Sequence, residues 1–263
     1  MSLQMSMVIF QEKPKLSSEE LQVALSTNWP DLSEATEVSD QETTLSFRIG
    51  ASDVVIGSMP TPIPWSDLDA PCATSTLWPE AATAIRTHKN HAIVTVSGEL
   101  SPLVLSTLLT QVTAALMASS SLSLGVFWTN AVMVVPKGLF IDFAVNVLPL
   151  GPPLPIWVDS RVGWAEKKNV SAGFTKGLAE LGLMELEAEH ATEPPSELKK
   201  RFESVARYLL EAGPVIKDGD TIGENEDEKI CVVYSTSAFG AKGSVMLLTY
   251  EATKRKHSWW KRW

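Results

Sequence analysis

The chain has 263 residues, of which 44% are hydrophobic and 20% are charged, and its net charge is −9. This composition indicates a globular protein with one large or two small domains, and the acidic charge argues against nucleic acid or an anionic membrane as a general partner. The two cysteines, Cys72 and Cys231, have neither metal-ligand spacing nor a disulfide framework. We therefore expect a cytoplasmic protein without a metal site or a cofactor.

No transmembrane segment is expected. The most apolar stretch, residues 103–118, is interrupted by serine, threonine and glutamine and is too short to cross a bilayer. The first six residues lack the basic region and the apolar run of a signal peptide. Residues 103–118 are instead predicted to form a central packing helix.

Residues 1–100 are predicted to form an N-terminal half with the order β-α-β-β-α-β. Ser17 followed by Glu20 is a capping box that starts one helix, and a second helix is expected from about Pro79 to Thr87. Residues 31–43 are polar and acidic and are expected to form a surface connection. The order is that of a ferredoxin-like fold, an antiparallel sheet with helices on one face. The four expected strands are 5–10, 44–49, 53–58 and 91–97.

Residues 58–79, called the proline strap here, connect the third strand to the second helix. Pro60, Pro62 and Pro64 fix φ and remove backbone donors, so an extended, polyproline-like course is expected in place of a helix. The strap also carries Trp65 and Trp78, and aromatic side chains of this size favour burial. We expect the strap to be a stiff brace packed on the domain.

Two carboxylates in the strap, Asp67 and Asp69, are candidate ligands or acid/base groups. Aspartates in such segments more often satisfy nearby backbone N–H groups in local turns, and no histidine or cysteine cluster accompanies these two. A ligand cleft beside the strap would use them together with Arg161 or Glu166. Trp65 is a further candidate for contact with a ligand or a partner.

Residues 101–253 are predicted to form a C-terminal α+β half, which shares a continuous sheet with the first half or packs sheet to sheet on it. Its clearest helix spans residues 196–212, where an apolar stripe runs until Gly213-Pro214 ends the helix. Further helices are expected at 137–148 and 174–181, with a rigid linker at 151–155. The expected strands are 124–128, 131–135, 156–165, 183–190, 230–234 and 245–250.

Three stretches resemble a known family. They are the string from Met59 to Ser75, the segment 218–223 followed by Glu228-Lys229-Ile230, and the segment 173–178. Together they are similar to a bacterial family catalogued as domain of unknown function 4261, and the resemblance spans most of the chain. The family carries no activity, so the resemblance implies a bacterial protein but assigns no catalytic residue.

The remaining ionisable groups have plainer explanations. Residues 218–228 are dense in oxygen ligands but lack the spacing of a calcium loop, so a solvated acidic loop is expected. His88 and His91, three residues apart, are expected to cap a helix end at the surface. His190, beside a glutamate-rich strand, is expected at an exposed edge. Cys72 has no basic partner and is expected to be buried.

Residues 254–263 form a basic aromatic tail that contains Trp259 and Trp260. Three roles are open for the tail: docking on the chain's own acidic surface around residues 185–193 or 224–228, insertion at a membrane interface, or contact with a protein partner. Self-docking and partner contact are favoured over the membrane.

The sequence therefore predicts an α+β protein of two ferredoxin-like or related α/β-sandwich halves with largely antiparallel sheets. Two classes of function are open. The first is a non-enzymatic protein-binding or adaptor module, which is favoured because no nucleophile, metal or phosphate motif is recognised. The second is a small-ligand-binding protein or hydrolase-like enzyme with a cleft beside Asp67 and Asp69. The oligomeric state is left open.

Overall fold

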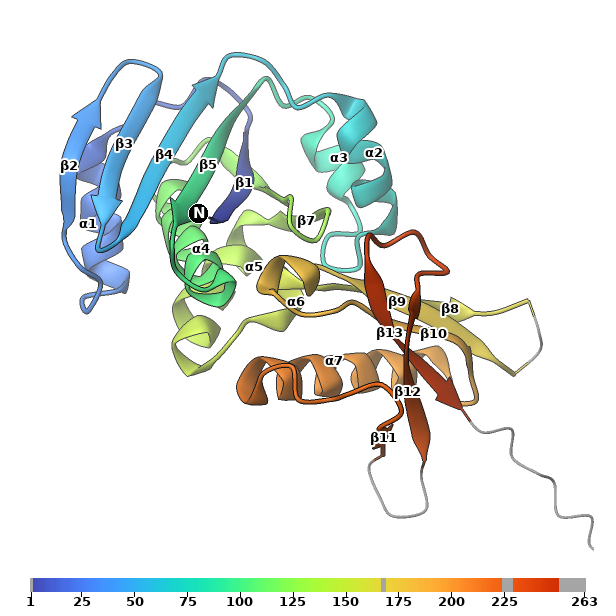
Figure 1. Cartoon of the computed structure of the whole chain (residues 1–263). Helices are drawn as coiled ribbons and strands as arrows, with labels where there is room; N and C mark the ends of the chain where they lie inside the picture. Colours follow the sequence, from blue (N-terminus) through green and yellow to red (C-terminus); the bar gives the residue numbers. More distant parts are fainter. Residues whose placement is uncertain (1, 167–168, 224–228, 251–263) are drawn as a thin grey trace, which may run out of the picture. The chain divides into compact units, whose positions relative to one another are not determined.

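A computed structural model describes residues 2–166, 169–223 and 229–250 (Figure 1). These residues divide into two compact units, residues 2–159 with 176–183 and residues 160–175 with 184–250. One sheet has seven strands and the other has six. The predicted α+β class with two largely antiparallel sheets is confirmed.

The seven-stranded sheet of the first unit is antiparallel, with the order β2-β3-β4-β5-β1-β6-β7. β1 pairs with β5 along its whole length, from Ser2↔Gly98 to Phe10↔Asn90. β5 pairs with β4 as well as with β1, whereas a ferredoxin-like sheet places the first strand between the fourth and the third. The unit is therefore one of the related arrangements that the prediction also allowed. The strands are β1 (Ser2–Phe10), β2 (Ala35–Asp40), β3 (Thr44–Ile49), β4 (Ser52–Met59), β5 (Asn90–Gly98), β6 (Ser123–Trp128) and β7 (Met133–Pro136).

The boundary predicted near residue 100 falls inside this unit, which corrects the expected division of the chain. β6 pairs with β1 at Val8↔Val126, so residues after 100 complete the first sheet. The elements themselves were predicted from local periodicity. Pairing between strands far apart in the sequence leaves no such local signal, because it depends on contacts made only in the folded chain.

Two helices, α1 (Ser18–Asn28) and α4 (Pro102–Ala118), lie behind the strands in the view of Figure 1. The Oγ of Ser6 on β1 lies 2.7 Å from the Oγ1 of Thr113 on α4, which places α4 against this face of the sheet. The Oγ of Ser17 accepts a hydrogen bond from the backbone N–H of Glu20, so the predicted cap of α1 is confirmed.

The opposite face carries two shorter helices, α2 (Trp65–Thr74) and α3 (Ala81–Ile85). Leu68 of α2 and Ile85 of α3 are fully buried in one hydrophobic cluster with residues of three strands, Ile9, Phe127 and Val134. Alternate side chains of β1 therefore serve two cores, because successive residues of a strand point to opposite faces.

The rest of the first unit is a run of short helices. α5 (Lys137–Asp142) continues into a π-helix, η1 (Phe143–Val147), and a 3₁₀-helix, η2 (Leu148–Leu150). α6 (Leu154–Trp157) follows, where the Nε1–H of Trp157 donates to Thr110 Oγ1 of α4 at 2.8 Å. The 3₁₀-helix η3 (Ala179–Leu181) completes the unit. None of the helices that the structure describes has both the length and the apolar character needed to cross a membrane.

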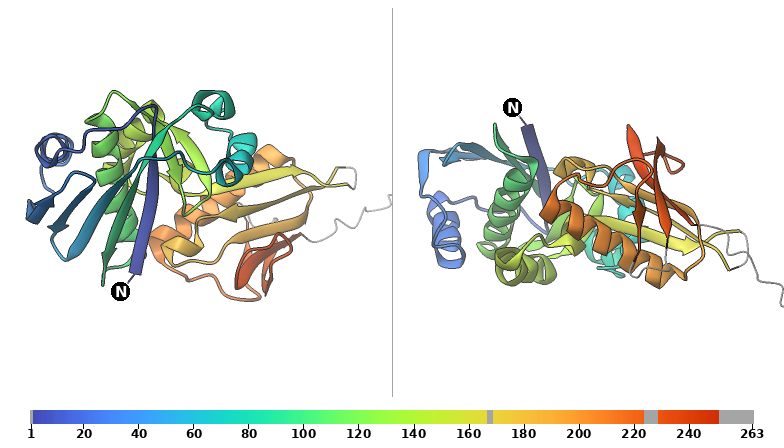
Figure 2. Two further views of the ribbon diagram at one scale, coloured as in Figure 1. Left: turned by 90° about the horizontal axis from the view of Figure 1, so that it is seen from above. Right: turned by 60° about the horizontal axis from the view of Figure 1, so that its bottom comes forward.

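The six-stranded sheet has the order β11-β12-β13-β10-β9-β8. β10 pairs in parallel with β13, at Leu186↔Met246, and antiparallel with β9. α7 (Pro195–Ala212) lies along one face of the sheet (Figure 2) and buries the predicted apolar stripe, including Leu198, Phe202 and Leu209. The strands are β8 (Asp159–Trp164), β9 (Ser171–Lys176), β10 (Leu186–Ala191), β11 (Thr221–Ile222), β12 (Ile230–Thr236) and β13 (Ser244–Tyr250).

The helix predicted over residues 174–181 is wrong, because its first half belongs to β9. Phe174 pairs with Glu187 of β10. Gly173 allows β8 to pass close by, since a Cβ built there would lie 2.5 Å from the carbonyl oxygen of Arg161. Sheet pairing on both sides therefore overrides a segment whose local sequence indicated a short helix.

The predicted surface connection at residues 31–43 contains the edge strand β2, in which most residues are exposed. β2 pairs with β3 from Ala35↔Ile49 to Asp40↔Leu45. Its Glu37 and Asp40 are charged side chains of the kind that discourage further pairing at a sheet edge.

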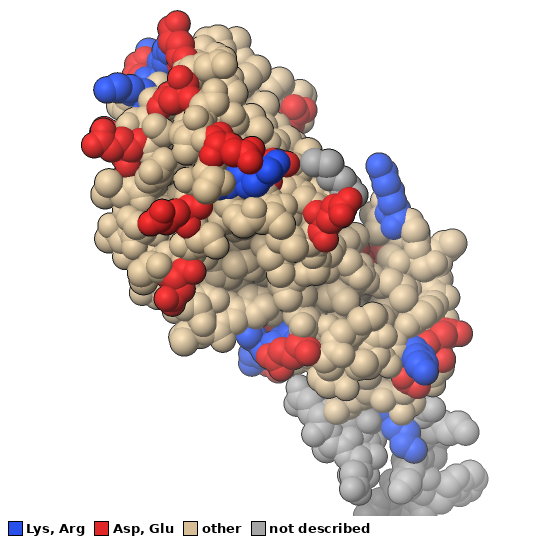
Figure 3. Space-filling view, turned by 60° about the vertical axis from the view of Figure 1, so that its left-hand side comes forward, with Lys and Arg blue, Asp and Glu red and all other residues tan. Residues whose placement is uncertain are grey.

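Figure 3 shows acidic side chains spread over the face drawn, with basic ones among them.

Candidate functional site

The proline strap is extended only as far as Pro64 and then turns into α2, so the prediction that it avoids a helix is wrong from Trp65 onward. Pro64 is the N-cap residue of α2, a position where proline does not interrupt helical hydrogen bonding. Pro71 lies inside α2 and removes one hydrogen bond. Leu68, Pro71 and Cys72 form the buried side of the helix, and this burial offsets the loss.

Two buried histidines hold the extended part of the strap. The backbone N–H of Ile63 donates to His88 Nε2 at 2.8 Å, and His91 Nδ1 donates to the carbonyl oxygen of Thr61 at 2.7 Å. Both histidine residues are 6% exposed. The expected surface position of these histidines is wrong, because both are buried and bond to backbone groups of the strap. The expected capping role holds for His88, whose Nδ1 donates to the carbonyl oxygen of Ile85, the last residue of α3.

The contacts of His88 also define its charge. Its Nδ1 lies 2.6 Å from the carbonyl oxygen of Ile85 and must carry the proton, while its Nε2 accepts from Ile63 and must lack one. His88 is therefore neutral. Burial, together with the neighbouring His91, lowers the pKa of His88, and this outweighs the opposite effect of the hydrogen bond to Ile85.

Trp65 is fixed at the surface by two contacts. Its Nε1–H donates to Asp69 Oδ1 at 3.1 Å, one turn further along α2. The guanidinium carbon of Arg86, just after α3, lies 4.1 Å from the centre of the tryptophan ring, which is a cation–π contact. Trp65 itself is half-buried and packs against the core cluster below. The α2–α3 surface is defined here as Trp65, Asp69, Ala73 and Arg86.

Asp67 and Asp69 do not converge. Both are exposed on α2, and residues two apart on a helix point to opposite sides. Asp67 accepts from the hydroxyl of Ser66 at 3.2 Å, whereas Asp69 accepts from Trp65. An extended strap would have placed the two carboxylates on one side. The helix separates them, so they do not form an acid/base pair.

Cys72 is buried, as predicted, on the inner side of α2 with 4% of its surface exposed. Burial, with a smaller contribution from Asp69, raises the pKa of the Cys72 thiol to about 11. Cys231 on β12 is also a free thiol but is only partly buried. The two cysteines therefore differ in access and Cys72 is the less reactive.

We predict that Cys231 reacts with a thiol reagent at pH 7 while Cys72 stays protected. With a pKa of about 11, only about 10⁻⁴ of Cys72 is thiolate at this pH. In native buffer the reagent should label one thiol in the parent chain and none in the Cys231→Ser variant. The labelling rate of Cys231→Ser is then compared in native buffer and in guanidinium chloride. Equal rates in the two solutions would show that Cys72 is accessible in the folded chain.

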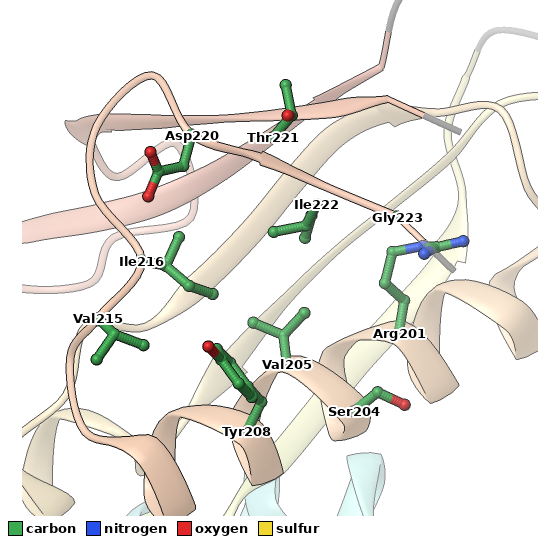
Figure 4. Close-up of a pocket in the computed structure, with 10 residues that line it drawn as sticks. All are labelled: Arg201, Ser204, Val205, Tyr208, Val215, Ile216, Asp220, Thr221, Ile222 and Gly223. Carbon is green, nitrogen blue, oxygen red and sulfur yellow. The ribbon is translucent and has the colours of Figure 1, made fainter. Parts of the chain in front are cut away.

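A groove lies beside α7 in the second unit (Figure 4). Its cavity volume is about 620 Å³, within the range of small-molecule sites. One wall comes from α7, where residues at i, i+3, i+4 and i+7 share a face. The other wall is the segment that leads from α7 into β11. The lining residues are Arg201, Ser204, Val205, Tyr208, Val215, Ile216, Asp220, Thr221, Ile222 and Gly223.

The segment that forms the second wall is pinned to the sheet. Tyr234 donates its hydroxyl hydrogen to the carbonyl oxygen of Ile216 at 2.5 Å, and its backbone N–H to Asp218 Oδ1 at 2.8 Å. Asp220 accepts from the backbone N–H of Lys217 at 2.7 Å. These bonds hold the wall in place, so the groove is a built feature of the unit.

A buried polar cluster lies at one end of the groove, where its Arg201 is a lining residue (Figure 4). Arg201 donates from Nε and Nη2 to the two carboxylate oxygens of Glu193, each at 2.8 Å. The hydroxyl of Tyr250 donates to the same carboxylate at 2.5 Å. Burial by itself raises the pKa of Glu193, but the hydrogen bonds from Arg201 and Tyr250 outweigh it and hold this pKa below its usual value. Glu193 is therefore ionised at neutral pH.

Sequence reasoning missed both Arg86 and Arg201. A signal for Arg201 existed, because it lies within the apolar stripe of α7, one turn after Leu198 and one turn before Val205. A cation at an inward position of an amphipathic helix indicates a buried ion pair. No comparable local signal places Arg86 over Trp65.

The other predicted residues lie apart. Arg161 on β8 lies with its guanidinium carbon 5.9 Å from the ring centre of Phe174, and Glu166 is exposed beyond the end of β8. His190 is exposed as expected. β10 is an inner strand of the sheet, but its pairing with β13 is at Leu186 and Glu187, so His190 lies beyond that paired part.

Glu187 on β10 has a structural role. Glu187, 1% exposed, accepts from the hydroxyl of Ser237 and from the backbone N–H of Ala238, which holds the loop between β12 and β13.

Among the described residues, no group of three or more histidine, cysteine or acidic side chains is arranged to hold a metal ion. Residues 224–228 of the acidic stretch, and the tail with Trp259 and Trp260, lie outside the described residues.

The two units thus define an α+β protein with a fixed aromatic surface in one unit and a groove in the other. Residues 174–248 match the family model described as domain of unknown function (DUF4261), which confirms the resemblance over this part of the chain. The match includes α7 and every residue that lines the groove, whereas the proline strap precedes it. Comparisons with curated proteins and with solved structures gave no match.

Proposed function

We propose that the chain is a non-enzymatic protein-binding module and that its partner contacts the α2–α3 surface. One observation carries the proposal: the ring of Trp65 is held at the surface between the carboxylate of Asp69 and the guanidinium of Arg86. Tryptophan and arginine are the side chains that most often dominate the free energy of binding at protein interfaces.

The α2–α3 surface is also rigid in the unbound chain. Leu68 and Cys72 bury the inner side of α2, and the buried histidine bonds to Ile63 and Thr61 hold the chain that leads into it. A preorganised contact surface loses less conformational entropy on binding than a mobile one. This rigidity supports a role in recognition.

The same proposal assigns the chain to the bacterial cytoplasm. Support for the cytoplasm comes from the two free thiols, Cys72 and Cys231, and the bacterial source rests on the resemblance noted in the sequence. A thiol that lacks a partner is typical of a reducing compartment. The alternative of a ligand cleft that pairs Asp67 with Asp69 loses support, since the helix points these side chains apart.

The test compares two variants of α2 that add the same side chain to opposite flanks of one helix. Ala73→Arg places a bulky cation beside Trp65 and Asp69, and Asp67→Arg places one on the far flank; both positions are exposed. The full chain, purified from its native cell extract, is expected to carry a stoichiometric protein partner. Ala73→Arg and Arg86→Ala should lose this partner, and Asp67→Arg should keep it.

Two results would contradict the proposal. One is equal retention of the partner by Ala73→Arg and Asp67→Arg, which would place the interface elsewhere. The other is a bound metabolite, found by native mass spectrometry, in place of a protein. Circular dichroism of each variant shows whether the fold is preserved, which both exposed substitutions should allow.

A further inference from the structure

We propose that the groove beside α7 binds the basic aromatic tail, residues 254–263, of the same chain. The proposal concerns the second unit and stands apart from the role of the α2–α3 surface. It rests on where the described chain stops, on the lining of the groove and on the composition of the tail.

The described chain stops near the end of the groove that Arg201 lines. Tyr250, the last residue of β13, lies opposite Ile230, which in turn lies opposite Ile222 of the groove wall. Neighbouring strands are about 4.8 Å apart, so Tyr250 is about 10 Å from Ile222. The Tyr250 hydroxyl also contacts Glu193, the partner of Arg201, and Figure 4 places Arg201 and Gly223 at one end of the groove, with Val215 at the other.

The tail is long enough to fill the groove. Trp259 is nine residues beyond Tyr250, a span of about 30 Å when extended. The α7 wall runs from Arg201 to Tyr208, eight residues that span about 10 Å of helix. The tail therefore reaches every part of the groove without a change in the sheet.

The lining suits indole rings. The side chains of Val205, Tyr208, Val215, Ile216 and Ile222 supply apolar surface, and two of them remain unusually exposed for their type: Tyr208 at 51% and Val215 at 44%. Tryptophan combines a large apolar ring with one N–H donor, so it favours sites that are apolar but rimmed by polar groups. Ser204 and Thr221 are such rim groups.

The charges favour a basic occupant. Arg201 lines the groove, but it forms a bidentate ion pair with both carboxylate oxygens of Glu193, which neutralises its charge. Asp220 brings an exposed carboxylate to the rim. The tail has five lysine and arginine residues and no acidic one, and attraction between the tail and this rim weakens with salt.

The direct experiment uses the chain shortened to residues 1–253 and a labelled peptide of residues 254–263. The shortened chain should bind the peptide, and the full chain should bind it much more weakly because its own tail occupies the groove. Tyr208→Glu and Val215→Glu should each weaken peptide binding to the shortened chain about tenfold or more, because each puts a charge in the apolar lining. Val23→Glu, at an exposed valine on α1, should leave it unchanged.

A second readout uses the full chain. Trypsin cleavage after Lys254 or Lys256 should be slow in the full chain and in Val23→Glu, and about tenfold faster in Tyr208→Glu, because binding protects a segment from proteolysis. Cleavage at one common rate in all three would overturn the proposal, as would equal peptide binding by the shortened chain and its Tyr208→Glu variant.

The full chain and the chain of residues 1–253 also distinguish two other binding partners of the tail, a second copy of the chain and a membrane. A mass that rises with concentration for the full chain, but not for the chain of residues 1–253, would show that the tail binds a second copy. Sedimentation of the full chain with anionic phosphatidylserine vesicles, lost on removal of residues 254–263, would assign the tail to a membrane surface. Either result contradicts docking within one chain.

Discussion

Replacing Leu68 with alanine is expected to destabilise the first unit by about 2–5 kcal/mol. Leu68 is fully buried and belongs to the cluster that joins α2 to β1, β6 and β7. The substitution removes apolar contacts and leaves a cavity that rigid surroundings do not fill. The measurement is the free energy of unfolding from urea titration, followed by circular dichroism.

The control for Leu68→Ala is Val23→Ala, since Val23 is 60% exposed on α1. This change should stay within about 0.5 kcal/mol of the parent chain. If Leu68→Ala also stays within that range, α2 does not brace the first unit, and the stiff backing inferred for Trp65 is lost with it.

Replacing Arg201 with methionine is expected to cost about 3–5 kcal/mol at neutral pH, because it strands the carboxylate of Glu193 without its partner in a buried site. The two side chains are only 9% and 14% exposed. Methionine keeps most of the length and apolar stem of arginine, so the effect reports mainly on charge. The double variant Arg201→Met/Glu193→Gln should regain most of the lost stability, because it removes the stranded charge.

The pH dependence of the Arg201→Met effect has a definite sign. In the parent chain the pKa of Glu193 lies below its usual value of 4.5, so the stability from this group is present above pH 4.5 and is lost as the pH falls through the lowered value. In Arg201→Met the unpaired carboxylate prefers to be protonated. The difference in unfolding free energy between parent and variant should therefore be largest at pH 7 and shrink below about pH 4.5; a difference that grows with acid would contradict the assigned pairing.

The helices with clear periodicity and caps were predictable from sequence. α1, α4 and α7 each begin at the expected residue or one before it, because Ser17, Ser101 and the prolines at 194 and 195 mark their starts locally. The alternation of Leu45, Phe47 and Ile49 likewise identifies β3 as a strand with one buried face. These signals lie within a few residues of the element that they define.

The strap shows why the site was harder to predict. Three prolines before residue 65 indicated an extended segment, but none of them stands inside α2, and Pro71, which does, is offset by the buried contacts of Leu68 and Cys72. Those contacts come from strands remote in sequence. The helix then reverses the expected relation between Asp67 and Asp69, so an error in secondary structure became an error in the candidate site.

The contacts that carry the proposed function also join distant residues. Arg86 reaches Trp65 only because α3 packs beside α2, and His88 accepts from Ile63 only in the folded unit. The histidines looked like surface groups because a pair at i, i+3 near a helix end often is exposed. Long-range hydrogen bonds of this kind cannot be derived from spacing alone.

The most direct test of the proposed role is hydrogen exchange of the full chain, alone and bound to the partner that co-purifies with it. Partner binding should slow exchange at amides of residues 65–74 and 81–87, the segments that carry Trp65 and Arg86. Protection confined to other segments, with residues 65–74 unchanged, would contradict the account and move the interface away from the α2–α3 surface.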